Sequence, residues 1–109
     1  MAQALGYVTE TDKGGYEGTL SMMSLQKRIR IIPNLRKAAD AEPDYRVFTA
    51  ENVEIGGGWN RTGKTSGKAY VSLTFAAPEF GQSRLFANLG KAAGQDDDRL
   101  MAILWNPKD

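Results

Sequence analysis

The feature that most constrains the fold of this 109-residue chain is a side-chain pattern with a period of two. Residues 68–75 show it best, reading Lys-Ala-Tyr-Val-Ser-Leu-Thr-Phe. Such alternation places successive side chains on opposite faces of an extended strand, one face toward a core and the other toward solvent. Similar runs predict strands at 16–23, 27–33, 45–50, 53–61, 68–75, 83–89 and 100–105.

Turn residues separate these runs. Clusters of Gly, Pro, Asn and Asp lie at 12–15, 33–34 and 63–67, among other places. Only 35–41 and 89–93 suit a helical turn, and a parallel α/β fold needs longer crossover helices. We therefore predict one all-β domain over 1–109, with about seven mostly antiparallel strands in a barrel- or sandwich-like arrangement. Helical content is minor, and an irregular segment lies near 34–42.

The composition excludes several kinds of chemistry. The chain has no cysteine and no histidine, which removes disulfides, thiolate sites, histidine-based triads and the usual histidine metal ligands. Acidic groups occur at Glu51 with Glu54 and at 96–98, but nothing in the pattern places two carboxylates in a cleft. No apolar run approaches the ~20 residues of a membrane helix, and no secretory signal is visible at the N-terminus. We expect a non-enzymatic, cytoplasmic protein without cofactor or metal.

Residues Gly58–Thr65 match the phosphate-loop pattern G-x-x-x-x-G-K-T. A true phosphate loop follows a strand and opens a helix, whose N-terminus holds the anion. Here Ser66 and Gly67 follow, and then the strand pattern 68–75, so we expect no helix at Lys64 or Thr65. The segment is predicted to be a hairpin, with no nucleotide as partner.

The run Gly56–Gly58 interrupts a strand pattern. Glycine inside a strand marks a bulge or sharp bend, or the close approach of a ligand or another backbone. A bend is the more common explanation, and both stay open at this point.

Positive charge is concentrated in the middle of the chain. Between Lys27 and Lys68 there are nine basic and five acidic residues, a local charge of +4, with aromatic residues interleaved. Single-stranded nucleic acids are bound by such surfaces, where cations follow the phosphates and rings stack on bases. Our first function hypothesis is therefore that the protein binds single-stranded DNA or RNA. The residues predicted to contact it are Arg28, Arg30, Trp59, Arg61, Lys64, Lys68 and Tyr70.

Within this set, the alternation predicts which strand faces are shared. It places Val53, Ile55, Trp59 and Arg61 on one face of their strand, and it places Tyr70 opposite an apolar face. Trp59 has an alternative role, because large aromatic side chains are more often core residues than contacts.

A second function hypothesis is a protein-interaction module without nucleic acid. Lysine and arginine on a half-exposed sheet are ordinarily solvated and protect its edges from aggregation. The net charge of +1 argues against tight non-specific binding to duplex DNA. Exposed sheet edges, with the apolar run Met101–Trp105, favour a homodimer or docking of a partner at an edge.

Several blocks along the chain also resemble a known family. They are Gly6-Tyr7-Val8, Gly15–Leu20, Pro43–Phe48, Glu54–Trp59, Tyr70–Leu73, Phe86–Leu89 and Leu104-Trp105. In this order they resemble the bacterial family called domain of unknown function 736. The resemblance implies a compact β-rich, cytoplasmic protein encoded on plasmids and integrative elements. It implies no catalytic residue, and relatives tend to carry other residues in the phosphate-loop lookalike.

Overall fold

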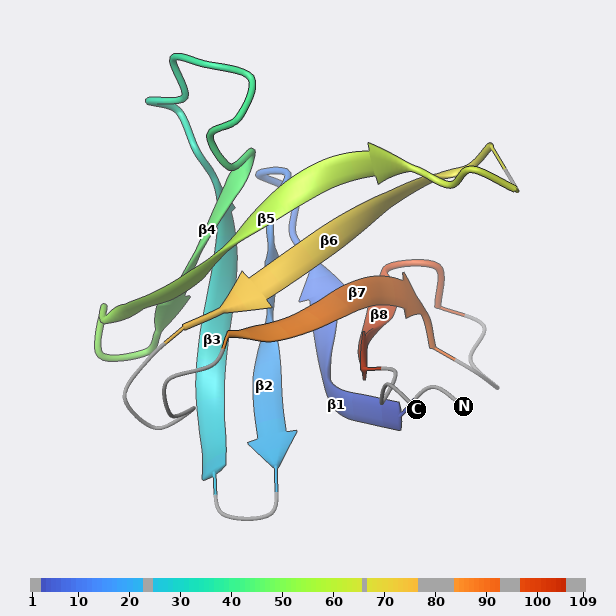
Figure 1. Ribbon diagram of the computed structural model, residues 1–109. Helices are drawn as coiled ribbons and strands as arrows, with labels where there is room; N and C mark the ends of the chain where they lie inside the picture. The colour runs from blue at the N-terminus through green and yellow to red at the C-terminus, as the bar shows by residue number, and fades with distance from the viewer. Residues whose placement is uncertain (1–2, 23–24, 66, 77–83, 93–96, 106–109) are drawn as a thin grey trace.

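A computed structural model of the protein describes residues 3–22, 25–65, 67–76, 84–92 and 97–105. Within these ranges the fold consists of eight strands (Figure 1). Their bounds are β1 Gln3–Glu10, β2 Tyr16–Met22, β3 Leu25–Pro33, β4 Tyr45–Thr49, β5 Glu54–Thr62, β6 Ala69–Phe75, β7 Leu85–Lys91 and β8 Leu100–Trp105. The described residues include no α-helix, and an irregular segment of turns and bends occupies 34–44 as expected.

The strands form a closed antiparallel barrel. Each strand pairs with the next in sequence, and β8 pairs with β1 to complete the ring. This confirms the all-β prediction and selects the barrel over the sandwich. The strand that the sequence did not predict is β1, whose inward positions hold Gly6 and Val8 while Tyr7 points outward. With a glycine inside and an aromatic ring outside, its alternation is too weak to stand out.

Closure of the barrel corrects the expectation of free sheet edges. Each of the eight strands has a hydrogen-bonded neighbour on both sides. The apolar run of β8 lies between β7 and β1, and Ala102 and Ile103 within it are buried. Along the paired stretches of these strands, edge pairing is therefore not available to a second copy or another protein.

The barrel interior is filled by side chains from the seven strands that alternation predicted and from β1. Its buried cluster consists of Val8, Leu20, Ile29, Ile31, Val47, Ile55, Val71, Leu73, Phe75, Ala87, Leu89 and Ile103. Eight-stranded barrels are just wide enough for side chains to fill them. The interior is thus a packed core, and any ligand must meet the outer surface or the ends.

The predicted face of β5 is wrong at its start. The pairing of β4 with β5 shifts between Val47 and Phe48, so that Val47 faces Gly56 and Phe48 faces Glu54. This bulge adds one residue to β5 and reverses the alternation. Val53 precedes the strand and is 56% exposed, whereas Ile55 is only 7% exposed and belongs to the core. Trp59 and Arg61 lie on the outer side of the barrel, opposite the core.

The glycine run is surrounded by the protein itself. A Cβ at Gly56 would lie 2.2 Å from the carbonyl oxygen of Thr74, and one at Gly57 would lie 3.1 Å from Pro43. A Cβ at Gly58 would meet Leu73 and Tyr45 at 3.1 and 3.3 Å. Neighbouring strands and side chains occupy the space that a side chain would need, which supports the bend over the ligand contact.

The phosphate-loop lookalike forms a hairpin turn, as predicted. The amide of Gly63 donates to the carbonyl of Lys68 at 2.9 Å, and Gly67 closes the turn with a φ of 70°. Lys64 and Thr65 lie in this turn rather than at a helix start. The described residues also contain no helix of the length and hydrophobicity that a membrane span requires.

Candidate nucleic-acid interface

The pairing of β5, β6 and β7 defines one outer surface of the barrel. Cross-strand neighbours on it include Arg61 with Tyr70 and Thr74 with Phe86. We call this surface the β5–β7 face, and its members are Trp59, Arg61, Tyr70, Ser72, Thr74, Phe86 and Asn88. The alternate residues of β6, from Val71 to Phe75, are buried in the core.

The β5–β7 face carries exposed aromatic rings, and the β5–β6 turn beside it carries positive charge. Residues 55–78 contain no aspartate or glutamate, whereas Arg61, Lys64 and Lys68 all lie within them. Figure 1 shows the turn between β5 and β6 projecting away from the barrel, and both Lys64 and Lys68 are exposed. Tyr70 shares this face with 37% of its surface exposed. Together with Trp59 on β5, five of the predicted contact residues therefore lie on one hairpin.

Arg28 and Arg30 lie elsewhere. They point outward from β3, and β4 separates that strand from β5. Arg30 stands opposite Glu17 and donates a hydrogen bond to Asn52 Oδ1. Arg28 lines a surface depression together with Glu17. The structure thus splits the seven predicted residues into two groups on different sides of the barrel.

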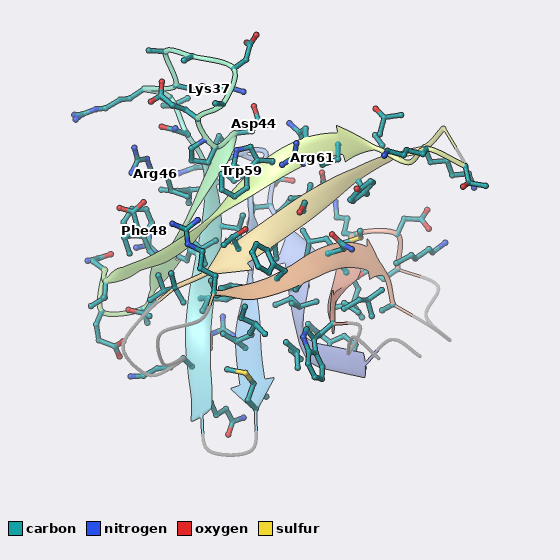
Figure 2. The ribbon with its side chains drawn as sticks, in the orientation of Figure 1. Lys37, Asp44, Arg46, Phe48, Trp59 and Arg61 are labelled. Atoms are coloured by element: carbon teal, nitrogen blue, oxygen red, sulfur yellow. The ribbon has the colours of Figure 1, made fainter. Side chains whose placement is uncertain are left out.

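Trp59 is half-buried on the outer surface and belongs neither to the core nor to the freely exposed rings. Its indole N–H donates to the carbonyl of Ala41 at 3.1 Å. The ring also covers Gly57, where an added Cβ would lie 3.4 Å from it, with the side chain of Pro43 beside it. Figure 2 shows Trp59 below Asp44 and the loop that precedes β4. The side chain anchors that loop to the barrel.

The loop 34–44 is ordered by hydrogen bonds that converge on its two ends. The amide of Asn34 donates to the carbonyl of Asp44, and its side-chain amide donates to the carbonyl of Pro43 at 2.9 Å. The side-chain oxygen of Asn34 accepts from the backbone N–H of Arg36 and from Nε of Arg46. Such closed loops present their outer residues at fixed positions.

Asp44 connects this loop to β5. Its carboxylate accepts hydrogen bonds from Lys37 Nζ at 2.6 Å and from the backbone N–H of Asn60 at 2.9 Å. The hydrogen bond from Lys37, followed by that of Asn60, holds the pKa of Asp44 below its usual value, and the charges of Lys37 and Arg61 act in the same direction. Figure 2 shows Arg61 on the strand beside Asp44.

Three of the acidic residues considered for catalysis are engaged in surface ion pairs, and Asp97 accepts a hydrogen bond from the backbone N–H of Arg99. Glu51 pairs with Lys27 at 3.4 Å and Glu54 with Arg46 at 2.8 Å. Asp98 pairs with Lys91 at 2.9 Å, while Asp96 lies outside the described residues. No group of three histidine, cysteine, aspartate or glutamate side chains within the described ranges is arranged to hold a metal.

Phe86 is the residue of this face that the sequence analysis missed. It is 61% exposed on the outer side of β7, opposite Thr74. A signal was present, because Phe86 shares its strand phase with the polar Asn88, whereas Leu85, Ala87 and Leu89 hold the apolar phase. An aromatic residue in the polar phase of a strand indicates an exposed ring.

Comparison with known proteins adds the family. A family model described as "Protein of unknown function (DUF736)" matches residues 4–108, nearly the whole chain. The chain belongs to the DUF736 family. No curated protein and no solved structure matches it. Since the description of DUF736 states no function, the site of this DUF736 protein is argued from its own geometry.

Proposed function

We propose that this protein is a non-enzymatic nucleic-acid-binding protein that holds single-stranded DNA or RNA on the hairpin of β5 and β6. Arg61, Lys64 and Lys68 contact phosphates, and Tyr70 stacks on a base. The observation that carries the proposal is the acid-free stretch 55–78, which places three cations in and beside the exposed β5–β6 turn and the exposed ring of Tyr70 next to them on β6.

The physical basis is local rather than global. A net charge of +1 gives little long-range attraction to a polyanion, so binding depends on cations gathered at one site. Three phosphate contacts on a single strand predict a slope of about −2 for log K against log salt concentration. A stacked base contributes roughly 1–3 kcal/mol with little dependence on sequence. Weak, salt-sensitive and sequence-tolerant binding is the expected behaviour.

The proposed setting is that of an accessory protein of a bacterial plasmid or integrative element, located in the cytoplasm. This part rests on the family resemblance alone.

Fluorescence anisotropy of a labelled oligothymidine at low salt tests the proposal. We expect binding that weakens as salt is raised, and further weakening in the double variant Lys64→Glu with Lys68→Glu. Arg28→Glu is the matched control, because it makes the same kind of charge reversal on β3, on another side of the barrel. Absence of binding at tens of micromolar protein, or equal loss in the control, would refute the proposal.

The alternative of a protein-interaction module is supported by exposed apolar side chains rather than by strand edges. Tyr7 is 52% exposed on β1, and Leu35 is almost fully exposed on the loop 34–44. A second copy or a protein partner would have to dock on these outer surfaces. Light scattering of the purified protein tests the self-association form of this alternative. Recovery of one protein partner that survives nuclease treatment tests the docking of another protein.

A further inference from the structure

We infer that Phe86 is a second base-stacking residue, so that the β5–β7 face binds a segment of several unpaired nucleotides rather than one. The inference rests on the proposed function and extends it to a residue on the third strand of the face. Phe86 belongs to no part of the core, and its ring is the most exposed aromatic side chain among the described residues.

Each exposed ring on this face has a cation beside it. Tyr70 stands directly across the β5–β6 ladder from Arg61. Phe86 lies two residues after Arg84, which is exposed and forms no ion pair with a described acid. A ring next to a guanidinium can stack on a base and hold its phosphate at the same time. This pairing of a ring with a cation occurs twice on one surface, whereas contact with a single nucleotide would require only one such pair.

The spacing of the two rings sets the length of strand that can reach both. The register pairs Thr74 with Phe86, so Phe86 lies one strand across and four residues along from Tyr70. With strand rise near 3.3 Å and strand spacing near 4.8 Å, the two Cα positions are separated by about 14 Å. Adjacent stacked bases are much closer than this. A bound strand must therefore run with extended backbone and bring two non-adjacent bases onto the rings.

Stacking on both rings requires an unpaired ligand. Stacking on Tyr70 and Phe86 requires base faces, which a duplex keeps covered by neighbouring base pairs. Trp59 does not supply a third platform, since its indole is hydrogen-bonded to Ala41 and packed beside Gly57. The ligand class is accordingly single-stranded DNA or RNA long enough to span both rings.

Oligothymidines of increasing length, from dT2 to dT12, test the inference on the full-length protein by anisotropy competition. For the wild type, we expect affinity to rise once the oligonucleotide spans both rings. Phe86→Ala should remove that rise and weaken dT12 binding by about tenfold or more, while its effect on dT2 stays small. Phe86→Tyr should retain the wild-type affinity, and Phe86→Leu should behave like Phe86→Ala, because leucine keeps apolar surface without a planar ring.

Tyr7→Ala is the matched control, because it removes an aromatic ring with 52% exposure from β1, outside the β5–β7 face. Its affinity for dT12 should equal that of the wild type. If the wild type binds but Phe86→Ala or Phe86→Leu leaves dT12 binding unchanged, this inference fails while the proposed function stands. If the wild type binds no oligonucleotide, both fail. A change of Phe86→Ala from dimer to monomer in light scattering, with unchanged affinity, would assign the ring to a protein contact and overturn the inference.

Discussion

Replacing Gly18 with alanine should destabilise the barrel far more than its one added methyl group suggests. Gly18 on β2 pairs with Val8 on β1, and β1 pairs in turn with β8 to close the barrel. A Cβ at Gly18 would lie 2.0 Å from the carbonyl oxygen of Tyr7 and 2.6 Å from Cα of Val8, both backbone atoms. Backbone atoms cannot rotate away as a side chain can, so the two strands must separate by about 1 Å.

The expected cost follows from that displacement. Overpacking alone costs typically 1–3 kcal/mol, and weakening two ladder hydrogen bonds adds about 1 kcal/mol each. We therefore expect Gly18→Ala to lower the free energy of unfolding by about 3–5 kcal/mol. For a domain of this size each kcal/mol corresponds to roughly 4 °C in the melting temperature, so the melting temperature should fall by about 12–20 °C.

Gly57→Ala provides the matched control. Its Cβ would meet the Pro43 side chain at 3.1 Å and Trp59 at 3.4 Å, and no backbone atom of a neighbouring strand is among its nearest contacts. Side chains can yield by a few tenths of an ångström, so we expect a loss of about 1 kcal/mol or less. Urea unfolding followed by tryptophan fluorescence and circular dichroism measures both variants. A Gly18→Ala protein within 0.5 kcal/mol of wild type, or equal losses in the two variants, would refute the reasoning.

Two further predictions concern the core and the loop. Leu73→Ala removes a fully buried side chain from the barrel interior and should lower the free energy of unfolding, measured in urea, by about 2–5 kcal/mol. Val53→Ala, at an exposed position, should lower it by less than about 0.5 kcal/mol. Similar losses in the two variants would contradict the placement of the core. The pKa of Asp44 is lowered in the folded state, so its contribution to stability is present above the ordinary value of 3.8 and is lost as pH falls through the lower folded value. Asp44→Asn should therefore reduce stability at pH 7 by no more than about 1 kcal/mol and by less at pH 3, and an equal reduction at both pH values would show that the carboxylate charge plays no part.

Alternation along the chain was sufficient to predict most of the strands because their inward positions carry large apolar side chains. It failed at β1. There the close approach of β2 leaves no room for a side chain at Gly6, so Val8 is the buried apolar residue on the described inner face of the strand. It also failed at the start of β5, because a bulge changes the phase of a strand and depends on its partner, here the shift opposite Val47. The anchoring of Trp59 by Ala41 joins segments 18 residues apart, and no local pattern reports such a contact.

The predicted binding residues divide for a reason that lies in the closure of the barrel. In an open sheet, outward side chains of β3 and β6 would share one flat surface, and the positive charge between Lys27 and Lys68 would act together. In a closed ring of eight strands the outward direction turns by about 45° per strand. Arg28 on β3 and Tyr70 on β6, three strands apart, therefore point in directions that differ by about 135°. A short, flexible single strand seated on the hairpin cannot also reach Arg28 without wrapping around the barrel, so charge reversal at Arg28 and at Lys64 should have separable effects.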